Sequence, residues 1–239
     1  MRLDKCIEKA ALASRKQTKR LFKLGKIVVD GRPARCLNQI VDPSFQEIVV
    51  DGQKIENQGC LYFLLHKPAG YVTAVSDLRH QTVLDLLRHE DRQTGLYPVG
   101  RLDRDTEGLL LITNNGPLGF RLLHPKHHVE KVYEVVVNGF LDTDAPSFFE
   151  SGVAFLDGTT CKPAHLEVLE RGLAESRARI RIQEGKFHQV KKMFLAYGVK
   201  VIYLKRIAFA GFELGNLPRG QYRQLKKAEL EELKAYFDI

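Results

Sequence analysis

An aspartate stands in a short polar loop directly before a continuous apolar run. Asp103 lies within residues 100–108, and residues 109–113 follow as Leu-Leu-Leu-Ile-Thr, a pattern that predicts a buried strand. The nearby Arg101 and Arg104 favour the ionised form of the carboxyl group, and a strand end holds it in a fixed place. An ionised carboxylate in a fixed position is suited to nucleophilic attack on a sugar or base carbon. By themselves the residues favour a simpler interpretation, a capped turn before a strand whose charged side chains are solvated.

Two further segments carry side chains that such chemistry needs. Residues 131–135 read Lys-Val-Tyr-Glu-Val, and the alternation of a strand places Lys131 and Tyr133 on one face. Residues 184–194 read as a strand end, a glycine turn and the start of a helix. A histidine in this place is a candidate general base, a structural residue or a contact to a ligand. The polar residues of this second segment that we single out are Lys186, His188, Gln189, Lys191 and Lys192.

The excess positive charge of the chain is confined to its first part. The net charge is +8; residues 1–35 contain 11 Lys or Arg and 3 Asp or Glu, whereas the rest of the chain is balanced. This part is patterned rather than a solvated tail, because apolar residues recur at helical spacing, Ser14 is suited to cap a second helix and Gly25 to end it. A basic helical face of this kind docks on the phosphates of a nucleic acid. Its basic residues are Arg2, Arg15, Lys16, Lys19, Arg20, Lys23 and Lys26.

The order of the elements predicts two domains. Residues 1–57 read as two helices followed by short strands, with Asp30-Gly31 as a hairpin turn. The polar, turn-prone sequence Asn57-Gln58-Gly59 is predicted to be the linker. In residues 61–239 short strands outnumber helices, which predicts an α+β domain built on a mainly antiparallel sheet. Its strands are predicted at 61–65, 109–113, 133–137, 164–169, 178–182, 200–203 and 207–212, and its helices around 83–88, 145–151, 188–197 and 227–237.

Several functional classes lack their signatures in this sequence. The eight histidines and four cysteines show no spacing typical of a zinc site, and no glycine-rich nucleotide-binding loop is present. We therefore expect no metal and no nucleotide cofactor. No apolar run has the length of a membrane helix, and the first residues lack the apolar core of a secretory signal. Together with cysteines that form no CxxC pair, these features predict a cytoplasmic protein with reduced thiols.

The loop around Asp103 closely resembles the catalytic motif of the pseudouridine synthases of the RsuA type, which modify ribosomal RNA. The sequence Gly100-Arg101-Leu102-Asp103 carries most of this likeness. Residues 1–57 resemble the S4 RNA-binding module. One departure is Asn114-Asn115-Gly116, where Asn-Asp-Gly is more usual, and it affects the detail of that loop rather than the chemistry. Further segments that match motifs of the family are residues 66–71, 131–135 and 184–194.

The resemblance implies isomerisation of uridine to pseudouridine within RNA, in which the C1′–N1 bond breaks, the uracil turns and a C1′–C5 bond forms. Asp103 would be the nucleophile, attacking either C1′ or C6. Tyr133 would pack against the target base, and Lys191 would pair with Asp103. No cofactor is implied, because there is no net redox change or group transfer. Beyond the basic helix, the residues expected to contact RNA are Arg101, Lys186, His188, Gln189 and Lys192.

The resemblance also limits the partners. The expected partner is 16S ribosomal RNA, free or in an assembling small subunit, bound by a monomer, although 23S enzymes share the fold and the motif. A non-catalytic RNA-binding or ribosome-assembly factor is a second class, which the loss of Asp103 would signal. An N-glycosidase is a third, and it would use Asp105 or Glu107 as a second carboxylate. The segments that favour the 16S reading are residues 125–131, 159–167 and 184–191.

Overall fold

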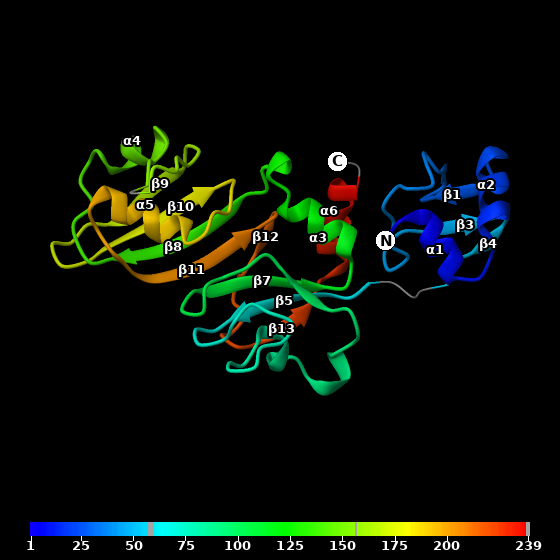
Figure 1. Ribbon diagram of the computed structural model, residues 1–239, viewed down its shortest axis with the longest axis horizontal. Coiled ribbons are helices and arrows are strands. Elements are labelled where there is room, and N and C mark those ends of the chain that lie inside the picture. The colour runs from blue at the N-terminus through cyan, green and yellow to red at the C-terminus, as the bar shows by residue number, and fades with distance from the viewer. Residues whose placement is uncertain (57–59, 156, 238–239) are drawn as a thin grey trace.

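The computed structural model describes residues 1–56, 60–155 and 157–237, which form two units. The linker predicted at residues 57–59 lies outside the described residues. We call the part before this gap the N-terminal unit and the part after it the C-terminal unit. The N-terminal unit lies at one end of the long axis, and the strands of the C-terminal unit extend to the other end (Figure 1). Within the described part of the chain, no helix is long and apolar enough to cross a membrane.

The N-terminal unit combines two short helices with a four-stranded antiparallel sheet. Its second helix begins with a capping box, in which Ser14 and Gln17 each accept a hydrogen bond from the other's backbone amide. The turn residues Asp30 and Gly31 have φ angles of 49° and 74°, as a tight hairpin requires. Both predicted helices and the hairpin are therefore present. The elements are α1 (Leu3–Lys9), α2 (Arg15–Lys23), β1 (Ile27–Val29), β2 (Arg32–Pro33), β3 (Ile48–Val50) and β4 (Gln53–Lys54), and the sheet order is β2-β1-β3-β4.

The C-terminal unit is built on a nine-stranded sheet that is mainly antiparallel, as predicted. Its main path runs in the order β13-β5-β7-β11-β8-β10-β9, and β7 and β11 are parallel neighbours at its centre. Their close approach requires Gly108, because a Cβ atom there would lie 2.2 Å from the Arg206 carbonyl oxygen. The strands are β5 (Tyr62–Lys67), β6 (Tyr97–Val99), β7 (Glu107–Thr113), β8 (Lys131–Val137), β9 (His165–Glu170), β10 (Ser176–Ile182), β11 (Val201–Phe209), β12 (Phe212–Glu213) and β13 (Tyr222–Gln224).

Three predicted elements of this unit, two strands and one helix, differ in the structure. The separate strands predicted at 200–203 and 207–212 are one strand, β11, followed by the short β12. The charged pair Lys205-Arg206 in the middle of that segment suggests the end of one strand and the start of another. The strand instead continues through the pair, with two shifts in register. The helix predicted around 83–88 is a single 3-10 turn, since Leu87 is already extended. The helices and turns are η1 (Val83–Leu86), η2 (His89–Asp91), α3 (Gly116–Leu123), η3 (Pro125–His127), α4 (Ala145–Glu150), α5 (Gln189–Tyr197), α6 (Lys227–Leu233) and η4 (Lys234–Phe237).

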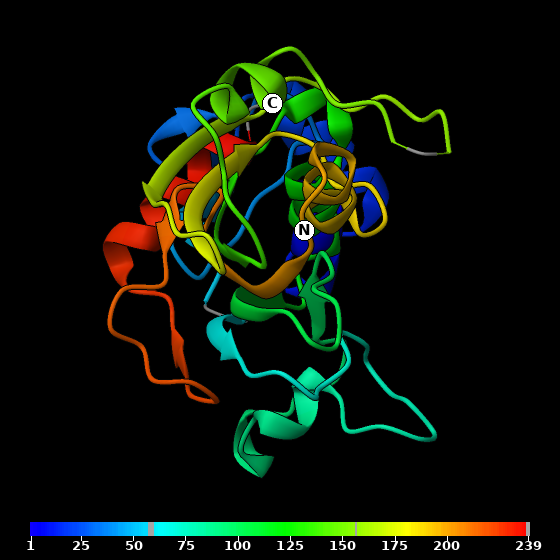
Figure 2. The same ribbon diagram turned by 90° about the vertical axis from the view of Figure 1, so that its left-hand side faces the viewer.

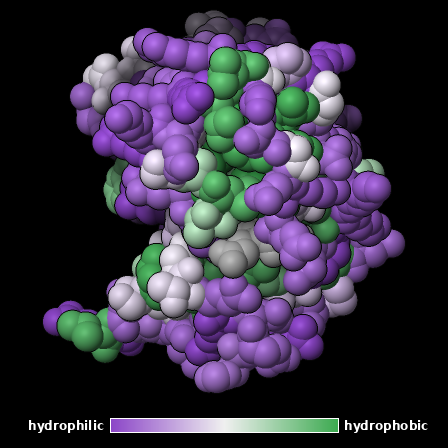
Figure 3. All heavy atoms as spheres, turned by 90° about the vertical axis from the view of Figure 1, so that its right-hand side faces the viewer, coloured by the Kyte–Doolittle hydropathy of each residue, from purple (hydrophilic) through white to green (hydrophobic). Residues whose placement is uncertain are grey.

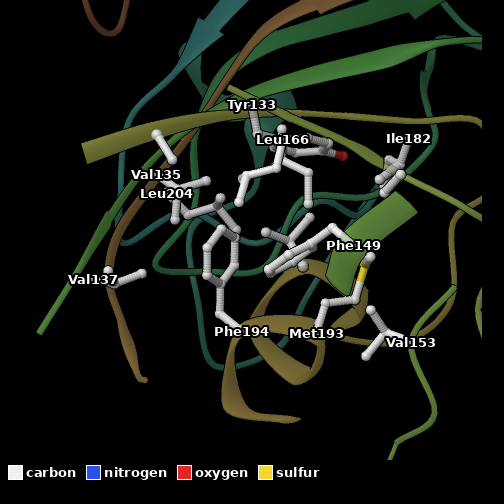
Figure 4. Close-up of a cluster of buried hydrophobic side chains, with 14 of the residues drawn as sticks. Tyr133, Val135, Val137, Phe149, Val153, Leu166, Ile182, Met193, Phe194 and Leu204 are labelled. Atoms are coloured by element: carbon white, nitrogen blue, oxygen red, sulfur yellow. The ribbon is translucent and has the colours of Figure 1, made fainter. Parts of the chain in front are cut away.

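Helices cover the sheet at separate places and enclose separate cores. Helices α4 and α5 pack against β8, β9 and β10, and Figure 2 shows α5 lying over these curved strands. Figure 4 shows the cluster they enclose, with Phe149 and Phe194 inside it and Tyr133 at its edge. Helices α3 and α6 contribute Leu118 and Leu233 to a second core with β5 and β7. The strands that carry the candidate site are thus held between two packed cores.

A buried carboxylate joins the N-terminal unit to the C-terminal unit. Asp42, which is fully buried, accepts a hydrogen bond from the Tyr62 hydroxyl in β5 and one from the Cys60 amide at 3.2 Å. The Tyr62 hydroxyl in turn accepts a bond of 2.8 Å from Asn115, which caps α3. Asn115 is the residue at which the chain departs from the family pattern, where an aspartate is more usual. Its side-chain amide donates the hydrogen bond to Tyr62. Buried polar groups satisfied in this way fix the position of the N-terminal unit against β5 and α3.

Candidate active site

A cleft of about 680 Å³ gathers most of the residues singled out in the C-terminal unit. It is lined by residues 100–104, by β8 and β11, and by residues 182–191 at the start of α5. Asp103, Tyr133 and Lys191 come from three separate segments and all line it. The predicted residues Arg101, Lys186, His188 and Gln189 line the same cleft.

The Asp103 carboxylate lies beside a cation from the first turn of α5. The Nζ atom of Lys191 is 3.1 Å from Oδ2 of Asp103, and Nε2 of His188 is 3.5 Å from Oδ1. The same ammonium group donates to both oxygens of Asp105, at 2.7 and 2.8 Å. Burial acts to lower the pKa of Lys191, but its bonds to Asp105 and Asp103 outweigh burial and raise that pKa above its usual value. Lys191 is therefore charged at neutral pH, and Asp103 faces the cleft with a cation at its side.

A buried lysine holds the loop that carries Asp103. Lys67, at the end of β5, has no exposed surface, and its Nζ atom donates to the carbonyl oxygens of Asp103 at 3.0 Å, Arg104 at 3.2 Å and Thr106 at 2.8 Å. Burial lowers the pKa of Lys67 to about 8. The Thr73 hydroxyl adds a bond of 2.7 Å to the Leu102 carbonyl. These contacts fix the loop backbone, so the direction of the Asp103 side chain is set before any substrate arrives.

The segment before α5 places an aromatic pair at the mouth of the cleft. His188 has a φ of 54°, in the left-handed region, and its ring stacks on that of Phe187 with centroids 3.8 Å apart. Phe187 is 67% exposed. The Nε2 atom of His188 lies 3.5 Å from Asp103 in the cleft. This position is compatible with a role as a base or as a contact to a ligand.

Three predicted RNA contacts in this segment have partners inside the protein. Gln189 is buried, and its side chain accepts from the Lys186 amide and donates to Glu184 at 2.9 Å, so these bonds hold the side chain in place and its contact with RNA stays a prediction. The Lys186 ammonium donates to a backbone carbonyl of the neighbouring loop. Lys192 pairs with Asp157 at 2.9 Å and lies over an aromatic ring. The ammonium group of Lys192 therefore has an anionic partner within the protein.

The second carboxylate of the glycosidase alternative is absent from the cleft. Glu107 is buried and points to other partners: it accepts from Arg219 at 2.8 Å and from Tyr203 at 3.1 Å. Burial acts to raise the pKa of Glu107, but these hydrogen bonds outweigh burial and lower it. Asp105 is bound by Lys191, and its bond to that ammonium lowers its pKa. Both carboxylates are thus held ionised by cations, and neither is suited to act as an acid.

Three further side chains line the cleft between the strands. Tyr133 is only 7% exposed, because most of its ring packs into the core between β8 and α5. Lys131 and Arg206 lie beside it. Sequence reasoning assigned no role to Arg206 or Lys67. The sequence does mark both residues as unusual. Lys67 is a charged residue at the end of an apolar strand, and Arg206 is a charged residue within another strand.

The predicted basic face is present but lies far along the molecule from α5. Figure 3 views the end that carries the N-terminal unit, and hydrophilic residues cover most of it. Lys26 pairs with Asp51 at 2.7 Å and Arg2 with Asp4 at 2.8 Å. The other basic residues are exposed and form no ion pair within the described part of the chain; they are Arg15, Lys16, Lys19, Arg20 and Lys23.

Comparisons with known proteins agree with this geometry. The family model described as RNA pseudouridylate synthase matches residues 61–196. An uncharacterized RNA pseudouridine synthase of Bacillus subtilis is 41% identical over 98% of both chains. Ribosomal large subunit pseudouridine synthase B of B. subtilis is 37% identical, covering 99% of this chain and 97% of that protein. Ribosomal small subunit pseudouridine synthase A of Escherichia coli K12 is also 37% identical, over 96% and 98%. A crystal structure of a pseudouridylate synthase, 30% identical, superposes with a TM-score of 0.67 over 98% of this chain and 99% of that one.

Proposed function

Since the chain belongs to the RNA pseudouridylate synthase family, we propose that it converts a uridine of ribosomal RNA to pseudouridine with Asp103 as the nucleophile. The observation that carries the proposal is the pair formed by Asp103 and Lys191, 3.1 Å apart in a cleft of the C-terminal unit. The charged ammonium group of Lys191 holds the carboxylate in place, as nucleophilic attack on a substrate in the cleft requires. Relatives named for the large and the small ribosomal subunit support ribosomal RNA as the substrate.

The proposed chemistry needs the target base outside its stack. The Asp103 carboxylate is only partly exposed within the cleft, so a uridine has to be extruded to reach it. Asp103 then forms a bond to C1′ or C6, and the C1′–N1 bond breaks. The uracil turns and re-attaches through C5, the bond to Asp103 breaks and releases its carboxylate, C5 loses its proton and N1 gains one. Tyr133, which lines the cleft, would pack against the base and replace part of the lost stacking. Lys191 aligns the Asp103 carboxylate for the attack.

The N-terminal unit is proposed to bind the RNA as an S4-like module. Its α2 helix presents five exposed cations that lack ion pairs within the described part of the chain: Arg15, Lys16, Lys19, Arg20 and Lys23. Contacts to phosphates supply affinity with a salt dependence and little sequence readout. Because this unit is fixed against β5 and α3, it would position the RNA relative to the cleft.

Within ribosomal RNA, we propose the 16S molecule, free or in an assembling small subunit, as the substrate of a cytoplasmic monomer. The proposal depends on residues 125–131, 159–167 and 184–191, which favour the small-subunit type. The 23S molecule is the second candidate, because relatives named for the large and the small subunit are equally identical to this chain, at 37%.

The test is to map pseudouridines in the ribosomal RNA of cells that lack this protein. We expect one pseudouridine of 16S RNA to disappear, to return with the intact gene and to stay absent with Asp103→Asn. The purified variant should still bind the RNA, because an amide keeps the shape of the carboxylate. Loss in 23S RNA alone would show the 16S assignment to be wrong. Release of free uracil by the purified protein would instead indicate a glycosidase.

A further inference from the structure

Arg206 is a buried cation for which the described residues provide no anion. The side chain is 2% exposed and lines the cleft that contains Asp103. Its Nε atom donates to the Leu109 carbonyl at 2.8 Å, and its guanidinium lies 4.9 Å from the centroid of the Phe209 ring. Its Nη2 atom is buried without any hydrogen-bond partner in the described part of the chain. An arginine is always charged, and a buried charge that lacks an acceptor is costly to maintain.

A second cation stands on the same wall of the cleft. Lys131 lies 5.7 Å from the centroid of the same Phe209 ring, and its Nζ atom donates to the Val129 carbonyl at 2.9 Å. No ion pair is formed by Lys131 within the described residues. Burial, and then the charge of Arg206, lower its pKa to about 8, against a smaller opposite effect of Glu184. The Glu184 carboxylate is itself taken by Gln189 and by a backbone amide.

Arg206 and Lys131 are neighbouring cations in the lining of the cleft. Such a pair is suited to bind an oxygen atom that carries negative charge. When the C1′–N1 bond breaks, its electron pair goes to N1 of the uracil and is shared with the carbonyl oxygens. The pair that forms C1′–C5 comes from the uracil ring, C5 then loses its proton and N1 takes one up, so nothing else is consumed. Attack at C6 likewise places charge on a carbonyl oxygen. In both cases the negative charge of the attacking Asp103 carboxylate passes to the base, and a cation close to the carbonyl oxygen stabilises it there.

We propose that Arg206, with Lys131 beside it, binds a carbonyl oxygen of the target uracil and stabilises the negative charge that the base carries during isomerisation. This inference depends on the proposed function, since it assigns a further catalytic residue to the same cleft. A backbone phosphate is the other anion that such cations bind. The burial of Arg206 favours the flat edge of a base, because a phosphate linked into a chain reaches exposed cations more readily.

The test combines changes in the protein with changes in single atoms of the RNA. The RNA is a fragment in which the wild-type chain forms pseudouridine, made also with 2-thiouridine or 4-thiouridine at the target. We expect Arg206→Met to lower the single-turnover rate about 10²–10³-fold, with the Kd for RNA changed less than threefold. One of the two thio-substitutions should slow the wild-type chain and have a smaller effect on Arg206→Met, which identifies the oxygen that is bound.

Two control variants separate this role from structural damage. Arg206→Lys keeps a charge in place and should restore part of the rate. Lys205→Met removes the neighbouring cation of β11, whose side chain points to the opposite face, and should leave the rate unchanged. The melting temperature of each variant is measured, so that the rates are compared between folded proteins.

The possible outcomes are distinct. If both thio-substitutions slow the wild-type chain and Arg206→Met equally, Arg206 does not bind the base and the inference is wrong. A Kd for RNA raised more than tenfold with a normal rate would make Arg206 a phosphate contact and also overturn it. If the wild-type chain forms no pseudouridine in any ribosomal RNA, the proposed function itself fails, and the inference with it.

Discussion

The Nζ atom of Lys191 lies 3.1 Å from the Asp103 carboxylate, across the junction between the loop before β7 and the start of α5. Nothing in the local sequence of either segment requires this contact. It arises because the fold brings both segments to the lining of the same cleft. The pair therefore connects the positioning of the proposed nucleophile with the packing of α5.

Removing this cation tests its role directly. We expect Lys191→Ala to lower the rate of pseudouridine formation about 100-fold or more, because the Asp103 carboxylate loses the cation that aligns it in the cleft. Lys191→Arg should retain activity within about tenfold. Asp105→Asn removes the other carboxylate that Lys191 contacts and is the matched control. A loss as large as that of Lys191→Ala would show that the contact of Lys191 with Asp105, rather than its contact with Asp103, carries the effect.

Tyr133 calls for a conservative substitution, because its ring is part of the core. Tyr133→Ala would leave a cavity at a cost of about 3–5 kcal/mol in the free energy of unfolding. Tyr133→Phe keeps the ring, and if stacking is its function the variant retains substantial activity. A role in proton transfer predicts a loss of about 10²–10⁴-fold. Single-turnover rates for Tyr133→Phe and Tyr133→Leu, with melting temperatures, distinguish these two roles, and normal turnover by both variants would exclude Tyr133 from the site.

Lys67 is predicted to support the loop rather than the reaction. Lys67→Met keeps the length of the side chain but removes its hydrogen bonds to the loop carbonyls. We expect the free energy of unfolding to fall by about 2–4 kcal/mol, with a loss of activity that exceeds any loss of RNA binding. Denaturant titration provides the first value. Lys200→Met, at an exposed position, should change neither quantity, and unchanged stability of Lys67→Met would contradict the proposed support.

The basic face of α2 should determine the salt dependence of RNA binding. Replacing Lys16, Lys19, Arg20 and Lys23 together by Gln should weaken binding and reduce the slope of log K against log salt by about 1–3, since each lost phosphate contact removes roughly 0.7–0.9. The control is the pair Lys200→Gln and Lys227→Gln. Substitution is a cleaner test than deletion of the N-terminal unit, because deletion would also expose Tyr62 and Asn115. An unchanged slope would mean that this face does not touch the RNA.

A basic limit of activity is expected near pH 8. The pKa of Lys131 is lowered to about 8 by burial and then by Arg206, so its positive charge is present below this pH and is lost as the pH rises above it. If that charge helps to hold the base, the rate falls in this range. Lys131→Arg remains charged and should move the fall to higher pH. Because the pKa of Lys67 is also about 8, only the difference between the two pH profiles tests Lys131; identical profiles would assign the fall to another group.

The relation between sequence and structure differs from element to element. The capped second helix, the Asp30-Gly31 hairpin and the strand after Asp103 are local patterns, and the structure confirms them. The segment around Arg206 is read incorrectly from sequence as a break between two strands. A charge inside a strand suggests a turn unless one knows that the strand borders a polar cleft.

By itself, the sequence determined the candidate nucleophile, the basic helix and the mainly antiparallel sheet, because each depends on neighbouring residues or on a regular period. The family resemblance already indicated Lys191 as the partner of Asp103. Tertiary structure alone decided that Asp105 shares this cation, that Lys67 holds the loop, that Glu107 binds Arg219, and that Arg206 lies buried in the same cleft. These relationships join residues that are far apart along the chain. Their distances follow from how the strands pair and the helices pack, and no local pattern specifies them.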